Sequence, residues 1–143
     1  MGIPIGNTRE EITQREVLIR NFYRQWKEKN PTQRKYNLSL KDYINIRYVS
    51  IDETSRHAAK TYLSTLAVMQ LDAILTNAKK VSYSKIKPNN KNQSGFVKMI
   101  IMQYQSPGIG KVKLTVGIKR RTKEKVQYCI TAIEARKTKQ EAK

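Results

Sequence analysis

The sequence predicts an α+β fold, with two or three N-terminal helices followed by a four-stranded antiparallel β-meander. Within residues 8–78, apolar residues recur at three- and four-residue steps, which is the helical period. Within residues 81–134 they recur at two-residue steps, which is the period of a strand. Turn-forming residues separate the later segments, and a length of 143 residues favours one domain.

Residues 8–29 are predicted to form the first helix. Thr8 and Glu11 have the spacing of a capping box, and an apolar stripe at the helical period follows them. Asn30 and Pro31 end the pattern, because the residue before a proline is disfavoured in the helical conformation.

A short segment and a long helix are predicted between residues 38 and 78. Residues 38–47 are ambiguous and fit a short helix with Ser39 at its N-cap, and residues 48–51 fit an extended segment. Residues 54–78 are predicted as one helix, because apolar positions recur at helical steps and two lysines follow its C-terminal end. This helix is nearly neutral and rich in alanine, so much of its surface is expected to be buried.

Four strands are predicted in the basic meander, at residues 81–86, 96–104, 111–119 and 126–133. Arg120–Lys125 is predicted as the last hairpin connection, and residues 135–143 as a frayed basic tail. One sheet face is expected to pack on the helix of residues 54–78. The core face of the last strand is predicted to carry Val126, Tyr128, Ile130 and Ala132. The open face of the sheet is predicted to carry Lys111, Lys113, Thr115, Lys119, Gln127 and Thr131.

Positive charge is concentrated in the C-terminal part of the chain. The formal net charge is +18, and residues 79–143 carry 17 basic and 3 acidic side chains. Residues 37–78 carry four of each, and residues 1–36 carry 8 basic and 4 acidic side chains. Such an excess attracts polyanions, of which nucleic acid is the commonest large one in a cell. The nucleic-acid-binding residues are predicted to be Lys98, Lys111, Lys113, Lys119, Lys123 and Lys125.

Metal, cofactor and membrane functions are not predicted. The chain has one histidine and one cysteine, far apart, so it has no zinc-spaced ligand cluster. No stretch approaches 18 uncharged apolar residues, and the N-terminal residues lack the apolar run of a signal peptide. The single Cys129 has no intramolecular disulfide partner, which fits a reducing cytoplasm, and association with a virion is the alternative.

His57 is the candidate proton acceptor, because histidine is the side chain that exchanges a proton near neutral pH. The alternative is a half-exposed histidine with no role. Arg120 and Arg121 are candidate phosphate ligands, since the guanidinium fork matches phosphate geometry, and the alternative is a solvated turn. Thr131 is predicted on the open face of the last strand, where its hydroxyl could touch a phosphate.

The helical stretch SRHAAKTYLSTLAVMQLDAILTNA leads into a meander that ends in KLTVGIKRRTKEKVQYCITAIE. This layout, over about residues 50–134, resembles the barnase/EndoU/colicin/RelE-like superfamily of small metal-independent ribonucleases and toxins, the phage-borne members above all. The resemblance implies an acid/base role for His57 and a last-strand hydroxyl at Thr131. It also implies a phosphate stabiliser among Arg120, Arg121 and Lys123. The chain lacks the second histidine that many members use.

Three functional hypotheses follow. The first is a small RNA-binding protein of phage or mobile-element type that cleaves RNA without a metal ion. The second is a non-catalytic nucleic-acid-binding module, with RNA favoured over DNA as the partner. The third is a structural protein of a virion or mobile element that packs on nucleic acid or on an acidic protein partner. The sequence does not indicate an oligomeric state.

Overall fold

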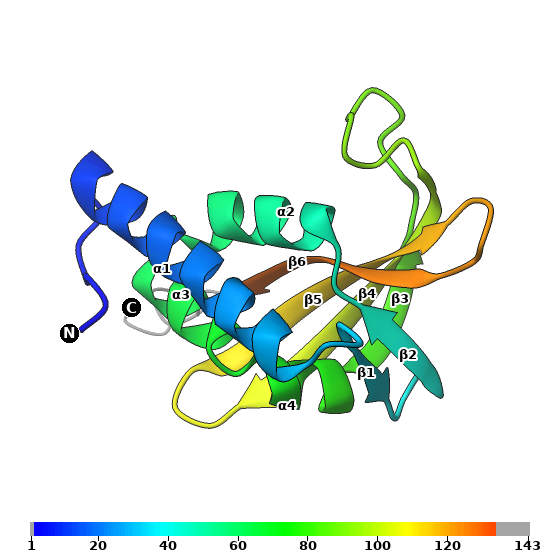
Figure 1. Cartoon of the computed structure of the whole chain (residues 1–143), viewed down its shortest axis with the longest axis horizontal. Helices are drawn as coiled ribbons and strands as arrows, with labels where there is room; N and C mark the ends of the chain where they lie inside the picture. Colours follow the sequence, from blue (N-terminus) through cyan, green and yellow to red (C-terminus); the bar gives the residue numbers. More distant parts are fainter. Residues whose placement is uncertain (1, 134–143) are drawn as a thin grey trace, which may run out of the picture.

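The computed structural model describes residues 2–133, in which four helices pack around one six-stranded mixed sheet (Figure 1). The strand order is β1-β2-β6-β5-β4-β3, and all neighbours are antiparallel except β2 and β6, which are parallel. The α+β class is confirmed, and the sheet has two more strands than predicted. In chain order the elements are α1 (Arg9–Lys29), β1 (Arg34–Asn37), β2 (Asp42–Asn45), α2 (Tyr48–Ala58), α3 (Tyr62–Val68), α4 (Leu71–Asn77), β3 (Lys79–Ser84), β4 (Phe96–Ser106), β5 (Gly110–Lys119) and β6 (Lys125–Ala132).

Helix α1 has the predicted bounds and the predicted N-terminal cap. The Thr8 hydroxyl accepts a hydrogen bond from the Glu11 amide at 3.1 Å, and the Glu11 carboxylate accepts one from the Thr8 amide at 3.2 Å. Ile19 and Tyr23 are fully buried, so this face of α1 covers the core. The capping box therefore fixes where the helix begins, and burial of its apolar stripe holds it in place.

Residues 38–47 do not form the predicted short helix. They form the turn and second strand of the β1–β2 hairpin, in which Ile44 and Ile46 are both fully buried. Asn45, between them, faces away from the core and lies opposite Val126 of β6. A two-residue alternation thus places both isoleucines in the core, and burial overrides the helical reading of this short segment.

Asn37 is the residue that anchors this hairpin. Its buried side-chain amide donates hydrogen bonds to the carbonyls of Leu75 (2.8 Å) and Ala78 (3.0 Å). Its side-chain oxygen accepts a hydrogen bond from the Leu40 amide at 2.7 Å. Because this one side chain forms hydrogen bonds with backbone groups in the turn and at the end of α4, it favours a hairpin over a helix here.

The single helix predicted over residues 54–78 is instead three helices, and residues 48–51, predicted as extended, begin α2. The Thr65 hydroxyl donates hydrogen bonds to the carbonyls of Ala58 and Thr61, both at 3.0 Å. The Thr61 side chain caps the start of α3. At the break between α2 and α3, two threonines therefore form hydrogen bonds with backbone groups that a continuous helix would pair internally. No glycine or proline marks either break in the sequence.

Strands β3 to β6 form the predicted antiparallel meander, but β6 does not alternate throughout. Its pairing with β5 shifts between Thr115 and Val116, as in a β-bulge. Beyond the shift Gln127 faces the helices, where it accepts a hydrogen bond from the Tyr23 hydroxyl (2.5 Å) and donates one to Thr54 (2.9 Å). The placement of Gln127 on the open face is therefore wrong.

The same bulge moves Tyr128 out of the helix-facing core in which it was predicted. Tyr128 and Val126 belong to a smaller apolar cluster with Phe96 and Met99. Ile130 remains in the main core, as predicted. One extra residue in β6 is thus enough to place a tyrosine hydroxyl on the open side of the sheet.

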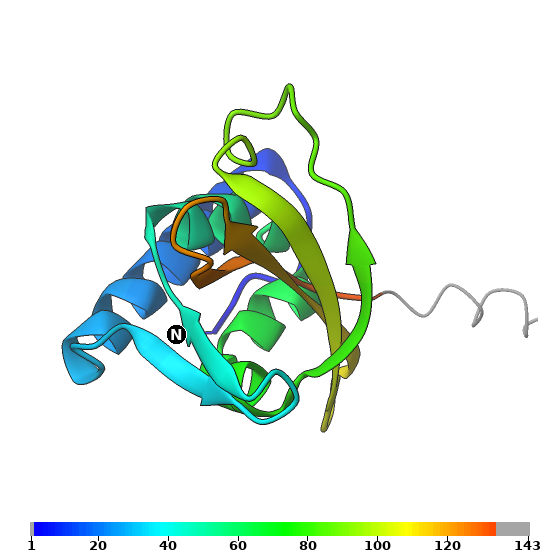
Figure 2. The same cartoon turned by 90° about the vertical axis from the view of Figure 1, so that its right-hand side faces the viewer.

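The sheet curls so that its two edges approach each other (Figure 2). The Lys80 amide at the start of β3 donates a hydrogen bond to the Ser39 hydroxyl in the β1–β2 turn, at 3.1 Å. No helix within residues 2–133 has the length and apolar character needed to span a membrane. The predicted tail, residues 135–143, lies outside the described residues.

Candidate functional site

Helix α2 lies along β6 (Figure 1). Strand β2 pairs with β6 only at Asn45 and Val126, so α2 covers much of the remaining edge of β6. Thr54 and Ala58 of α2 are fully buried. Glu53 and His57, on another side of α2, line a hollow over the open face of the sheet.

This hollow, called the His57 hollow below, has a volume of about 380 Å³. Glu53 and His57 contribute from α2, Lys113 from β5, and Tyr128 and Thr131 from β6. The segment between β3 and β4 forms another wall. The structure thus brings the predicted proton acceptor and the predicted strand hydroxyl into one site.

Glu53 holds the imidazole of His57. The Nε2 atom of His57 lies 3.2 Å from Oε1 of Glu53, whose side chain is 4% exposed against 42% for His57. Oε2 of Glu53 accepts hydrogen bonds from Asn92 (2.5 Å) and Arg56 (2.8 Å). A buried carboxylate fixed from three sides therefore orients the ring through its Nε2 atom.

The segment between β3 and β4 is tied to the hollow by two amides. Asn92 donates to Asp52 at 3.1 Å as well as to Glu53, which fixes the segment to α2. The Gln93 amide donates to the Tyr128 hydroxyl at 3.2 Å, and its oxygen accepts from the Lys87 amide at 2.7 Å. These bonds hold the wall in place over β6.

Tyr128 and Cys129 lie at the base of the hollow and are both protonated near neutral pH. Burial raises the pKa of the Tyr128 phenol, and the nearby Glu53 carboxylate adds to this effect. Burial also raises the pKa of the Cys129 thiol to about 12. Tyr128 can therefore donate a hydrogen bond to a ligand, and Cys129 is not an activated nucleophile.

The positive charge of the hollow comes from three lysines. Lys113 is the cross-strand partner of Thr131 on the open face, so the two side chains leave the sheet side by side and both line the hollow. Lys85 and Lys87 reach the hollow from the segment that follows β3. Within residues 2–133 none of the three forms an ion pair with a carboxylate. The hollow therefore offers uncompensated positive charge to an anion.

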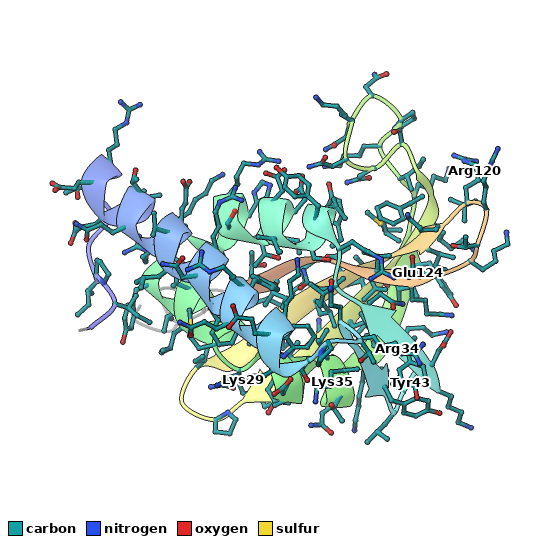
Figure 3. All side chains as sticks on the ribbon, viewed as in Figure 1. Lys29, Arg34, Lys35, Tyr43, Arg120 and Glu124 are labelled. Carbon is teal, nitrogen blue, oxygen red and sulfur yellow. The ribbon has the colours of Figure 1, made fainter. Side chains whose placement is uncertain are left out.

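The two arginines predicted as phosphate ligands lie elsewhere. Arg120 and Arg121 are exposed in the β5–β6 turn, at the tip of that hairpin (Figure 3), and neither lines the His57 hollow. Arg120 donates a hydrogen bond to the Phe96 carbonyl at 3.3 Å. Lys123 occupies the same turn with a φ of 64°. The hairpin tip and the hollow are separate basic sites.

The remaining four predicted lysines lie in four different places. Lys125 forms an ion pair with Asp42 at 2.7 Å, which holds the pKa of that carboxyl below its usual value. Lys98 lies over the ring of Tyr83, and Lys111 lines a different hollow near the start of β3. Lys119 ends β5. Of the six predicted lysines, only Lys113 lines the His57 hollow.

Sequence reasoning missed Glu53, Tyr128 and the lysines that follow β3. Glu53 stands four residues before His57, which is one turn of a helix, and this spacing is a usable signal. The helix was predicted to start at residue 54, so Glu53 fell outside it. The position of Tyr128 depends on the β6 bulge, which no residue pattern marks.

The described residues contain no candidate metal site. Within this part of the chain, no three His, Cys, Asp or Glu side chains are grouped so that they could hold a metal ion.

Comparisons of the chain with protein-family models, with curated proteins and with solved structures give no match. The functional assignment therefore rests on the geometry of the His57 hollow.

Proposed function

We propose that this protein binds RNA in the His57 hollow and cleaves it by attack of a ribose 2′-hydroxyl on the adjacent phosphate. One observation carries the proposal. His57, held by a buried carboxylate, lies in the same hollow as Lys113 and Thr131. A proton acceptor beside groups that bind phosphate oxygens is the minimum that this reaction needs.

In the proposed reaction, His57 accepts the proton of the 2′-hydroxyl while the 2′ oxygen forms its bond to phosphorus. The bond from phosphorus to the 5′ oxygen breaks, which leaves a 2′,3′-cyclic phosphate on one fragment. The leaving 5′ oxygen takes a proton from water, since the chain has no second histidine, and the hydroxide so formed takes up the proton held by His57. Lys113 and the Thr131 hydroxyl stabilise the charge that develops on the phosphate oxygens.

RNA is favoured over DNA because the attacking group is the 2′-hydroxyl, which DNA lacks. The charge of the C-terminal part of the chain supports binding to either polymer, through neutralisation of phosphates. The layout resemblance to the barnase/EndoU/colicin/RelE-like superfamily is part of the same proposal. In this proposal Lys113 takes the phosphate-binding role that the sequence assigned to Arg120 or Arg121.

The test is incubation of the purified protein with single-stranded RNA in the presence of EDTA. We expect cleavage with a 2′,3′-cyclic phosphate end, detected by mass spectrometry, and no cleavage of the same sequence as 2′-O-methyl RNA. His57→Ala should lower the rate by at least about 100-fold, the usual contribution of a general base.

A pair of variants on one strand separates the hollow from general charge. Lys113→Ala should slow cleavage strongly, whereas Lys119→Ala, on β5 but outside the hollow, should not. Salt-dependent binding of intact RNA would contradict the cleavage claim and favour the non-catalytic module. Absence of both binding and cleavage would leave the structural-protein hypothesis, which mass measurement at several concentrations addresses.

A further inference from the structure

We infer that an unpaired base of the bound RNA stacks on Tyr83, in a second hollow beside the His57 hollow. This inference rests on the proposed function, and it adds a second subsite that selects single-stranded RNA. The second hollow, called the Tyr83 hollow below, has a volume of about 370 Å³. It is lined by Tyr83, Ser84, Lys85, Ile86, Val97 and Lys98.

The two hollows lie on opposite faces of the sheet and meet at its β3 edge. Ser84 and Lys85, at the end of β3 and just after it, contribute to both. Tyr83 pairs with Ile100 of the main core, whereas Ser84 pairs with Met99, which lines the His57 hollow. An RNA strand whose phosphate lies beside Lys113 would therefore pass around this edge at Lys85 to reach Tyr83.

The Tyr83 hollow has an exposed apolar floor on an open sheet edge. Tyr83 is 52% exposed and Val97 is 44% exposed. All six residues of β3 are exposed, and β4 is the only strand paired with β3 within the described residues. A base extruded from a single strand could lie flat on this floor, whereas a base held inside a duplex could not reach it.

Two lysines surround the Tyr83 ring. The ammonium of Lys98 lies 4.6 Å from the ring centroid, and that of Lys80 lies 4.7 Å from it and 3.2 Å from the phenol oxygen. Neither lysine forms an ion pair with a carboxylate anywhere in residues 2–133. Both ammonium groups lie over the ring, so a stacked base would displace one of them, and the displaced lysine could bind a phosphate of the same strand. The positive charge around the ring disfavours a basic ligand.

The test measures binding of a five-nucleotide 2′-O-methyl RNA, which the protein cannot cleave. We expect Tyr83→Ala to weaken binding about tenfold, as the loss of one stacked base does, and Tyr83→Phe to weaken it less than twofold. Tyr48→Ala is the matched control, because Tyr48 is more exposed (73%) and lies on α2 outside both hollows. Thermal unfolding of each variant verifies its fold.

A second measurement places the stacked base. An abasic residue is introduced at each position of the oligonucleotide in turn. One position should weaken binding to the unmodified protein about tenfold and cause no further loss with Tyr83→Ala. Equal effects of Tyr83→Ala and Tyr48→Ala, or equal binding of a duplex of the same length, would overturn this inference alone. Failure of every oligonucleotide to bind would overturn the proposed function and this inference together.

Discussion

Glu53 connects α2, the wall of the His57 hollow and the imidazole. Its side chain is 4% exposed, and its two oxygens meet His57, Arg56 and Asn92. Both carboxylate oxygens are occupied by groups of the protein itself. In the proposed reaction Glu53 is therefore a positioning residue, which would act on cleavage through the orientation of the His57 ring.

Replacement of Glu53 tests this role at the scale of one residue. Glu53→Gln keeps the size of the side chain and removes its charge. We expect kcat to fall by about 10- to 100-fold with little change in KM, which is part of what a well-placed general base contributes.

The control for this variant is Asp52→Asn. Asp52 is the neighbouring carboxylate, shares Asn92 and Arg56 with Glu53, and makes no contact with His57. Equal losses of activity in the two variants would mean that both act on the fold of α2 and not on the imidazole.

At the scale of elements, the β1–β2 hairpin depends on one buried amide. We expect Asn37→Ala to lower the free energy of unfolding by about 2–3 kcal/mol, because three hydrogen bonds to the backbone are lost inside the protein. Chemical denaturation measures the change. Ser39→Ala removes an exposed acceptor of the Lys80 amide and should cost less than about 1 kcal/mol. A similar cost for both variants would show that Asn37 is not an anchor.

The elements that the sequence predicted correctly are those with local signals. The first helix has the Thr8 capping box, residues 111–119 alternate strictly, and clear turns separate the strands of the meander. The β1–β2 hairpin and the breaks in 54–78 depend on side chains such as Asn37 and Thr65, which bind backbone far away or in a neighbouring helix. Such contacts exist only in the folded chain, so a periodicity cannot predict them.

The candidate site was predictable only in part, because its residue types can be read from the sequence whereas their distances depend on the fold. His57 and Thr131 were chosen for their chemistry and predicted face, and the packing of α2 along β6 brings them into one hollow. The arginines of the β5–β6 turn were chosen for their charge and for the fork geometry of the guanidinium group, not for a predicted position near His57. The number of basic residues in a segment does not show how far they lie from His57. The β6 bulge that places Tyr128 at the hollow is not indicated by any residue pattern in the sequence.

At the scale of the whole molecule, positive charge occurs in several places besides the His57 hollow. Lys29, Arg34 and Lys35 lie around the end of α1 and in β1 (Figure 3), and Lys35 pairs with Asp72 at 3.7 Å. In the proposed function, many basic residues would therefore attract RNA without binding it at a defined place. A measurement is needed to distinguish the lysines that bind phosphates from these other residues.

The salt dependence of RNA binding, measured for single lysine variants, distinguishes these two groups of residues. Each phosphate neutralised on a single strand contributes about 0.7 to the slope of log K against log salt. We expect Lys113→Ala and Lys85→Ala each to reduce the slope by about that amount. Lys125→Ala should leave it unchanged, because Asp42 already neutralises Lys125. Equal slopes for all three variants would contradict a localised phosphate site.

Strand β3 also affects how copies of this chain meet one another. Beyond Lys80, whose amide is bound to Ser39, the outer edge of β3 is not covered by another strand within the described residues, and an uncovered edge is the usual route to edge-to-edge aggregation. Lys79 and Lys80 stand at the start of this edge, and Lys85 directly follows its end. Two such edges repel each other at close approach, so these lysines discourage self-association in concentrated solution.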